Sequence, residues 1–532
     1  MTSRRGAGED DPDMPAEPAV VPPRRRSPVR VAAVLAVSTA ILTACGGPGG
    51  GTGQVVPDGT LTLAMAFAPA AGYAVDTDDA FVVSQLGVTE SLVASGPDGQ
   101  PRPALATAWE QQSDARTWRF ELRPGVTFQN GEPLTGQAVA TALNHVAGVE
   151  APPRAVKGTG LQAAADGGAA VRVTTTAPDP ILPLRLSSAN TAILAPSAYG
   201  ATPPSVQGTG TGPMTITELN DTQSVTLQRN DTYWGERPQA ATVTANFVPD
   251  PAARALALRA GDADIAQELP ESSALEFTGD GYTNETVPAP RTASLMLNQS
   301  RPPFADVRVR QAVTAAIDRT ALGEQALAGS AIPASELFGP AVAWGSQEAP
   351  PPADPARARA LLAEAGYDAG NPLRVELGTY STRAELPTLA TAVQQMLREA
   401  GIEATIRVGG YDAREPDLLA GNYDMYLGSR SYLLDVPDAG ATLTSDYGCE
   451  GSYNINRYCS PEFDALLAPL ATVTDPAARQ DVFRQAAAKL NDEAVGVPLV
   501  HTSANGVGSR VAGYTVDPLA KTLVVPGLAK TE

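Results

Sequence analysis

The spacing of hydrophobic residues predicts a chain in which strands and helices alternate. Residues Gly59–Pro69 alternate apolar and polar side chains after a turn, which is typical of a strand entering a sheet. Thr117–Phe128 alternates in the same way, with aromatic and aliphatic residues on one face and charged residues on the other. In Asp79–Val93 the apolar residues recur at helical spacing, and Thr135 is placed to cap a further helix.

The second half of the chain shows the same alternation with clearer start and stop signals. Pro251 and Gly261 stand where helices begin and end, and residues 306–327 and 354–368 are also predicted to be helical. Residues 372–380 and 385–408 indicate a strand, a helix and a second strand, a unit that builds parallel sheet. Interleaved strands and helices favour an α/β fold, and no repeat of solenoid length is present.

The N-terminal region has the pattern of an export signal. A basic stretch precedes Val31–Leu42, an uncharged apolar run that is shorter than the roughly 20 residues needed to span a bilayer. Leu42-Thr43-Ala44-Cys45 resembles the lipobox of bacterial lipoproteins, in which the signal is cut before a cysteine that then carries lipid. We therefore predict a signal peptide over 1–44, lipidation of Cys45 and a glycine-rich tether over 45–58. The alternative is an ordinary secretory signal with an incidental cysteine.

Charge and composition narrow the possible partners. The 532 residues carry a formal net charge of −20, which disfavours nucleic acid and anionic membrane surfaces. No later apolar run has the length of a transmembrane helix, so the lipid is expected to be the only membrane anchor.

The remaining cysteines, Cys449 and Cys459, are predicted to form a disulfide, because an exported chain folds where disulfides persist. A metal site is the competing interpretation, but the only histidines, His145 and His501, are distant in sequence. The chain also lacks a G-x-S-x-G elbow, an H-E-x-x-H motif and a phosphate-binding loop. We accordingly predict no enzymatic activity, no catalytic residue, no cofactor and no metal ligand.

A long block of ordered motifs resembles one family. Residues 89–143 contain ESLV, PALA, TWRFELRPGVTF and GEPLTGQAV, and later stretches read GTGTGPM, RNDTYWG, ALRAGDADIA and NQSRPPFADVRVRQAVTAAIDR. These motifs resemble the family-5 extracellular solute-binding proteins of peptide and nickel ABC importers. The resemblance runs from about residue 59 to residue 500, and it does not specify the ligand.

The resemblance implies a two-lobed α/β fold of the periplasmic-binding-protein type with an extra inserted domain. Domain I is expected to combine residues 59–82, 190–290 and 495–532. Domain II is expected at 83–189 and domain III at 291–494. The two lobes are expected to close on a ligand by hinge motion.

The stretch Tyr423–Asn454 resembles the region where peptide-binding members carry R-x-x-W-x-x-D or a shorter W-x-x-D. The resemblance aligns Asp435 with the aspartate that binds a peptide's ammonium group and Tyr432 with the tryptophan. It aligns Arg430 with the arginine, although Arg430 lies one position closer to Asp435 than in the motif. Tyr73, in the loop after the first strand, is a further candidate for the cleft. In the alternative interpretation Asp435 caps a turn, Arg430 pairs with it and Tyr432 serves only in packing.

The expected function is therefore that of a monomeric, lipid-anchored receptor on the outer face of the cell membrane. It is expected to capture short peptides or similar amine-bearing solutes and to deliver them to ABC permease subunits with a cytoplasmic ATPase. The alternatives are a receptor for nickel or a metal–chelator complex, and a sensing lipoprotein that feeds no transporter.

Overall fold

A computed structural model describes residues 53–96 and 99–532. The predicted signal peptide, Cys45 and most of the predicted tether lie outside the described residues. Within the described ranges, no helix combines the length and apolarity that crossing a membrane requires.

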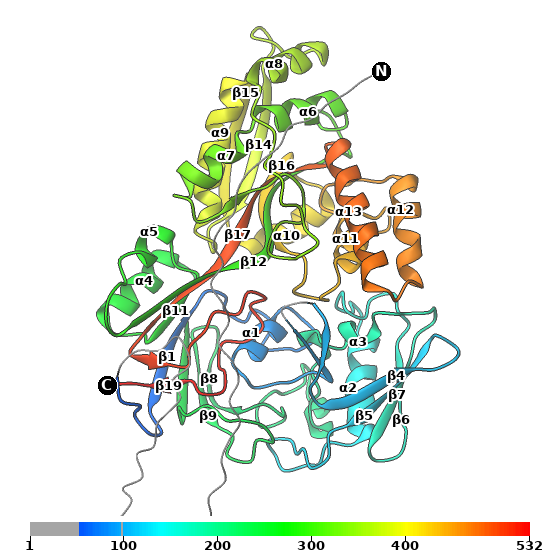
Figure 1. Cartoon of the computed structure of the whole chain (residues 1–532), viewed down its shortest axis with the longest axis vertical. Helices are drawn as coiled ribbons and strands as arrows, with labels where there is room; N and C mark the ends of the chain where they lie inside the picture. The colour runs from blue at the N-terminus through cyan, green and yellow to red at the C-terminus, as the bar shows by residue number, and fades with distance from the viewer. Residues whose placement is uncertain (1–52, 97–98) are drawn as a thin grey trace, which may run out of the picture. The chain divides into compact units, whose positions relative to one another are not determined.

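One large mixed sheet forms the framework of the described chain. Its main strands follow the order β15-β14-β16-β12-β17-β11-β1-β10-β9-β8, and β13 pairs with β17. Figure 1 shows the long strands β12 and β17 running side by side between the two ends of this sheet. Its strands are β1 (Thr60–Met65), β8 (Met214–Asn220), β9 (Ser224–Arg229), β10 (Thr242–Phe247), β11 (Ile265–Gln267), β12 (Tyr282–Leu297), β13 (Ile332–Pro333), β14 (Leu373–Tyr380), β15 (Ile402–Gly409), β16 (Met425–Ser431) and β17 (Gly496–Ser509).

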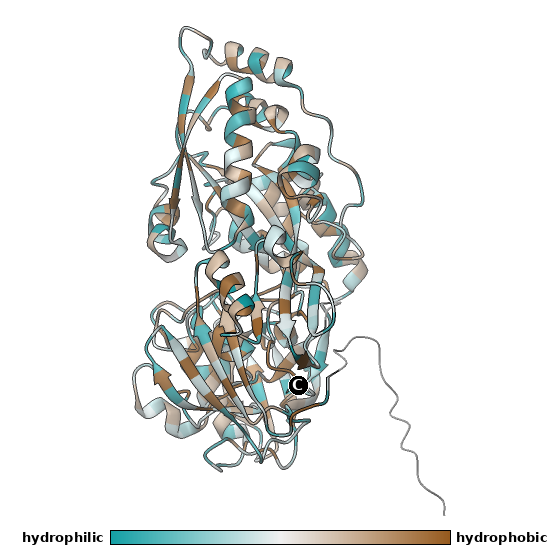
Figure 2. Cartoon of the chain, turned by 90° about the vertical axis from the view of Figure 1, so that its left-hand side faces the viewer, coloured by the Kyte–Doolittle hydropathy of each residue, from teal (hydrophilic) through white to brown (hydrophobic). Residues whose placement is uncertain are grey.

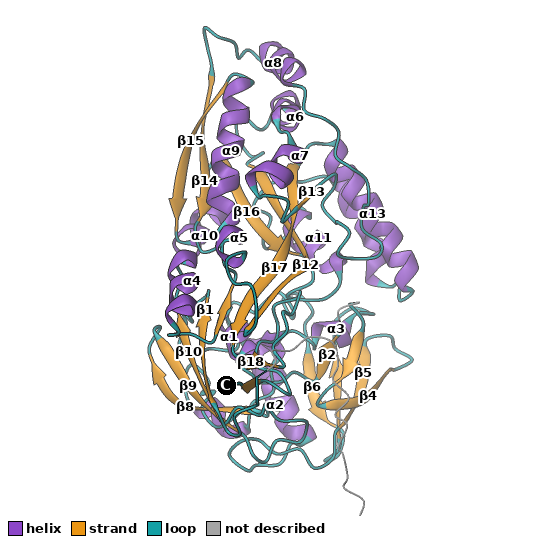
Figure 3. Cartoon of the chain, turned by 60° about the vertical axis from the view of Figure 1, so that its left-hand side comes forward, coloured by secondary structure: helices purple, strands orange, loops and turns teal. Residues whose placement is uncertain are grey.

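The two ends of the large sheet have separate hydrophobic cores. We call β1 and β8–β11 the β1 half, and β14–β16 the β14 half. The β14 half shares its core with α6 (Val307–Ala316), α8 (Pro355–Glu364) and α9 (Glu385–Glu399), which lie beside it in Figure 3. Helix α9 buries Leu386, Leu389, Val393 and Leu397, the spacing of one helical face. The predicted strand–helix–strand unit is confirmed, since β14 and β15 pair in parallel around α9.

A smaller antiparallel sheet has its own core. Strands β4 (Ala106–Gln111), β5 (Thr117–Leu122), β7 (Ala170–Thr174) and β6 (Gln162–Ala165) pair in that order. Helix α2 (Gly136–Gly148) packs on them, and the predicted cap is confirmed because Thr135 accepts a hydrogen bond from the Ala138 amide. We call this part, with α3 (Leu182–Arg185), the small-sheet part. Figure 2 shows hydrophobic residues interspersed along the strands of the chain.

Three helices near the end of the chain form a cluster of their own, and the other elements are short or peripheral. Helices α11 (Ala439–Tyr447), α12 (Pro461–Leu467) and α13 (Pro476–Asp492) form a separate apolar cluster. The remaining helices and strands are α1 (Asp79–Gln85), α4 (Pro251–Ala260), α5 (Glu271–Ala274), α7 (Arg319–Ala321), α8 (Pro355–Glu364), α10 (Tyr411–Ala420), α6 (Val307–Ala316), β2 (Val93–Ser95), β3 (Pro101–Pro103), β18 (Val511–Ala512) and β19 (Ala529–Lys530).

Two predicted helices are shorter than the pattern suggested. The prediction of one helix over 306–327 is wrong: α6 ends at Ala316, and α7 starts three residues later. Ile317 is extended, and the Asp318 carboxylate accepts a hydrogen bond from the Ala321 amide, which starts a new helix by capping. Helix α1 likewise stops at Gln85, just before Gly87, whose φ of 70° is left-handed.

Candidate ligand-binding site

A cavity of about 670 Å³ lies between the small-sheet part and the segment that runs from the end of β16 to α13. The small-sheet side contributes Arg154, residues 157–159, residues 175–181 and Arg185. The opposite side contributes Asp435, residues 440–442, residues 448–452 and Arg479. Its volume falls within the range of about 300–1,000 Å³ that is usual for small-ligand sites.

Asp435 lies on the wall of this cavity and pairs with cations from both sides. Its Oδ2 is 2.8 Å from Nε of Arg154, which belongs to the small-sheet part, and 3.5 Å from Nη2 of Arg430 in β16. The side chains of Asp435 and Arg154 are only 16% and 23% exposed. Burial alone would raise the pKa of Asp435, but the two arginines outweigh burial and hold the pKa below its ordinary value. Asp435 is therefore ionised at neutral pH.

Arg430 connects Asp435 to a second carboxylate. Its Nε lies 2.7 Å and its Nη2 3.2 Å from the two carboxylate oxygens of Asp446 in α11, a bidentate contact. Burial would lower the pKa of Arg430, and the two aspartates reverse that effect and raise it. Two arginines thus face two aspartates within this group.

Tyr453 packs against both arginines of this group. The Cζ atoms of Arg154 and Arg430 lie 4.6 Å and 4.5 Å from the centroid of its ring, which is the geometry of cation–π contacts. Its hydroxyl is hydrogen-bonded to that of Tyr411, whose ring centroid is 5.3 Å from that of Tyr380 in β14. A row of tyrosines therefore leads from the Asp435 group toward the end of β14.

The predicted aromatic residues lie in apolar clusters. Tyr432 is 2% exposed, and its ring packs against Phe338 and Trp344 at centroid distances of 4.9 Å and 6.4 Å. Tyr73 is 3% exposed, packs near Phe247, and donates a hydrogen bond from its hydroxyl to the Asp221 carbonyl. Burial raises the pKa of Tyr73 to about 12. Of the four predicted ligand residues, Asp435 lines the cavity, while Arg430, Tyr432 and Tyr73 are not among its lining residues.

Lys521 brings a further cation near Asp435. Its Nζ donates a 2.8 Å hydrogen bond to Oγ of Ser95, at the end of β2. Burial lowers the pKa of Lys521 to about 8, and the carboxylates of Asp517 and Asp435 act against that shift. The C-terminal segment thereby reaches the same charged group as the loop after β16.

A second ion pair joins the two halves of the large sheet. Nη1 of Arg383, between β14 and α9, lies 2.9 Å from Oε1 of Glu268, which follows β11. The Cζ of Arg383 is 5.4 Å from the ring centroid of Phe67, after β1. Burial would raise the pKa of Glu268, but the charges of Arg383, Arg291 and Arg254 outweigh burial and hold the pKa below its ordinary value. Each of the two ion pairs therefore combines an arginine, a carboxylate from another part of the molecule and an aromatic ring.

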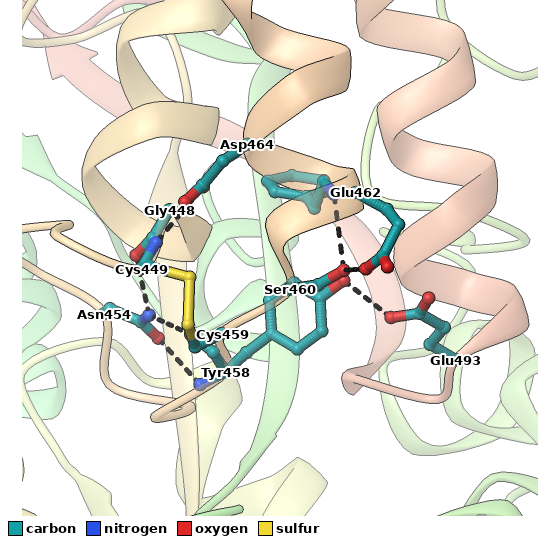
Figure 4. The surroundings of a disulfide bond; sticks show 10 residues. Gly448, Cys449, Asn454, Tyr458, Cys459, Ser460, Glu462, Asp464 and Glu493 are labelled. Carbon is teal, nitrogen blue, oxygen red and sulfur yellow. Dashed lines mark hydrogen bonds between the residues drawn. A yellow bond between two sulfur atoms is a disulfide. The ribbon is translucent and has the colours of Figure 1, made fainter.

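The predicted disulfide is present in the structure: Cys449 and Cys459 are bonded. The bond closes the loop between α11 and α12, and Tyr453 lies within that loop. Figure 4 shows the surroundings of the bond, with Asn454 hydrogen-bonded to Tyr458 inside the loop.

Both histidines lie outside any cluster of metal-ligand side chains in the part of the chain that the structure describes. Among the described residues, no three histidine, cysteine or acidic side chains are arranged to hold a metal ion. His501 lies in β17, hydrogen-bonded to Thr292, and burial lowers its pKa to about 4. His145 lies in α2, with its Nε2 3.7 Å from the Asp76 carboxylate.

Comparison with known proteins decides the family. Residues 100–454, more than half of the chain, match the family described as bacterial extracellular solute-binding proteins, family 5. The chain belongs to this family. It is 28% identical to the nickel-binding periplasmic protein of Escherichia coli K12, over 79% of this chain and 84% of that protein. It is 24% identical to the dipeptide-binding protein of the same strain, over 92% and 94% of the two chains.

The fold of this family-5 protein agrees with solved relatives. The crystal structure of NikA from Staphylococcus aureus in complex with Ni(L-His)2 superposes with a TM-score of 0.80 at 22% identity, covering 89% of this chain and 100% of that one. The predicted α/β fold of the periplasmic-binding-protein type is confirmed. The family consists of transport receptors, so this chain is a receptor and not an enzyme.

Sequence reasoning missed several residues of the two ion-pair clusters of this family-5 protein. Arg154 follows two prolines in a loop, and nothing in its local pattern indicates that it meets Asp435. Arg383 and Glu268 are 115 residues apart in sequence, so only the sheet order brings them together. Tyr453 had a usable signal, because an aromatic residue between two paired cysteines is held at a fixed position.

Proposed function

We propose that this protein is a monomeric, lipid-anchored receptor of an ABC importer that captures short peptides or similar amine-bearing solutes. It delivers them to the permease subunits, which a cytoplasmic ATPase drives. The observation that carries the proposal is the Asp435 carboxylate, ionised on the wall of the cavity and paired across it with Arg154.

A ligand with both an ammonium and a carboxylate group can replace the pair between Asp435 and Arg154. The ligand's ammonium group pairs with Asp435 and its carboxylate pairs with Arg154, while Arg430 keeps its bidentate contact with Asp446. Every buried charge keeps a partner during this exchange, so the large penalty of an unpaired buried charge does not arise. A ligand with only one of the two groups leaves either Arg154 or Asp435 less well paired, and the site discriminates against it.

Closure then follows from ligand contacts on both sides of the cavity. Because Asp435 and Arg154 are in direct contact, the two sides must separate to admit a ligand; a ligand that then bridges both residues favours the closed form over the open one by the contacts that it makes only there. Hinge closure around a ligand is a common arrangement in binding proteins.

A second candidate ligand is a metal ion carried by a small amino-acid chelator. The similarity to a nickel-binding periplasmic protein favours it, and the carboxylates of such a chelator suit Arg154. Because the described residues offer no cluster of metal ligands, the chelator would be recognised rather than the ion itself.

The test begins with native mass spectrometry of the purified protein, which identifies any co-purified ligand. Calorimetric titration then compares the ligand with its N-acetylated and C-amidated forms. For a peptide ligand, N-acetylation is expected to weaken binding of the wild type at least about tenfold, or ~1.4 kcal/mol. Asp435→Asn is expected to abolish the difference between free and acetylated ligand. Equal binding of the two forms by the wild type would contradict the ammonium role of Asp435.

A further inference from the structure

The loop closed by the Cys449–Cys459 disulfide faces two environments at once. Its first residues, 449–452, line the cavity beside Asp435. The next residue, Tyr453, is 8% exposed and contacts the guanidinium groups of Arg154 and Arg430. Arg154 comes from the small-sheet part, so the ring of Tyr453 reaches a residue on the opposite side of the cavity.

The two halves of this loop are held in different ways. The second half is tied to the large sheet, because Asn456 accepts hydrogen bonds from the Leu297 and Gln299 amides through its side chain and its carbonyl. Asn454 ties the loop to itself by donating to the carbonyls of Gly448 and Tyr458 (Figure 4). In the first half, which precedes Tyr453, the Cys449 amide donates to the Asp464 carboxylate and the Gly451 amide to the Gly448 carbonyl.

Tyr453 itself has only a few fixed points. Its amide donates to the Ser445 carbonyl over 2.9 Å, and its hydroxyl bonds to Tyr411. The ring also lies in the hydrophobic core of the β14 half, so its position depends on that core, on these two bonds and on the path of the chain between the two cysteines.

We propose that Tyr453, held in place by the disulfide, is a positioning residue that orients Arg154 and Arg430 around Asp435. Its ring gives both cations a fixed apolar and π-rich surface, so their nitrogens stay directed at the Asp435 carboxylate. The proposal concerns the same site as the proposed function, but it does not depend on which ligand binds there. Breaking the disulfide is expected to loosen Arg154 on the other side of the cavity as well as the loop itself.

Hydrogen exchange of the full-length protein without added ligand measures this coupling. The amides of Val156 and Lys157 bond to the Pro153 carbonyl, and that of Thr159 bonds to the Val156 carbonyl, so the turn after Arg154 contains protected positions. The Cys449→Ser/Cys459→Ser variant is expected to exchange these amides about fivefold faster than wild type, the effect of losing one weak cation–π contact.

Matched variants separate positioning from general stability. Tyr453→Leu is expected to speed exchange at Val156, Lys157 and Thr159 to the same extent with the disulfide intact. Tyr453→Phe keeps the ring but loses the hydroxyl bond to Tyr411, so it is expected to speed exchange at these amides less than Tyr453→Leu does. In the Tyr453→Leu background, removing the disulfide is expected to add nothing at these three amides. Amides of β9, whose Val225 and Leu227 lie in a different hydrophobic core from Tyr453, serve as an internal control.

Two results would overturn the proposal. One is faster exchange confined to residues 449–459 in the cysteine variant, with the 156–159 amides unchanged. The other is a Tyr453→Leu protein that matches wild type at those amides. If the cysteine variant unfolds as a whole, the Tyr453 variants still decide whether the ring positions Arg154. Because no ligand is added, a wrong ligand class leaves this result unaffected.

Discussion

The ion pair between Arg154 and Asp435 gives the sharpest test of the site's physical basis. The perturbation is a double-mutant cycle with Arg154→Gln, Asp435→Asn and both together. Nε of Arg154 and Oδ2 of Asp435 are 2.8 Å apart, and both side chains are mostly buried. At an effective dielectric constant of about 20, Coulomb's law gives an attraction of about 6 kcal/mol for unit charges at such a distance, before desolvation is subtracted.

Two effects reduce the net coupling energy. Desolvation takes back part of the attraction, and Arg430 can partly replace Arg154 because it already lies 3.5 Å from Asp435. We therefore expect a coupling energy of roughly 2 kcal/mol, at the lower end of values for close charge pairs at interfaces. Asp435→Asn is expected to cost more stability than Arg154→Gln. After Arg154→Gln, Asp435 still has Arg430 as a partner, whereas after Asp435→Asn, Arg154 has lost its carboxylate partner.

Urea unfolding of the four proteins supplies the coupling energy as the non-additive part of the free energies of unfolding. The matched control is the pair of Arg374 and Glu403, which has a similar separation of 2.7 Å but side chains that are 70% and 54% exposed. Its coupling is expected to stay below about 1 kcal/mol, as for other surface pairs. The reasoning is refuted if the buried pair couples no more strongly than this surface pair.

Three further predictions concern other parts of the chain. Cys45→Ser is expected to release the protein into the medium, and fractionation that finds it still on the membrane would argue against lipidation. Tyr432→Ala is expected to destabilise the fold by about 3–5 kcal/mol in urea unfolding, because the ring is buried against Phe338 and Trp344. Tyr432→Phe should cost about 1 kcal/mol, and an alanine variant as stable as wild type would exclude the packing role. The pKa of Asp435 in the folded protein lies below its ordinary value of 3.8, so its contribution to stability is complete at higher pH and is lost as pH falls through that folded pKa. Wild type should therefore lose more stability than Asp435→Asn in urea unfolding between pH 5 and pH 3, and parallel pH profiles would count against the ion pair.

Much of the fold could be predicted from local pattern. Period-2 alternation predicted β5, helical spacing and a capping threonine predicted α2, and strand–helix–strand order predicted the parallel pairing of β14 and β15. These features depend on neighbouring residues, so the sequence carries them directly. The disulfide was predictable for the same reason, since two cysteines close in sequence in an exported chain have few other fates. The family was recognisable because its motifs are short and ordered along the chain.

The tertiary structure decided which charges meet. Asp435 is 281 residues from Arg154, and no local pattern relates them; they are neighbours only because the loop after β16 packs on the small-sheet part. Tyr432 and Tyr453 are both aromatic residues near Asp435 in sequence, yet the first packs against Phe338 and the second against two arginines. Local sequence fixes hydrogen bonding and periodicity within an element, whereas the partner of a long charged side chain depends on the packing of elements that are distant in the chain.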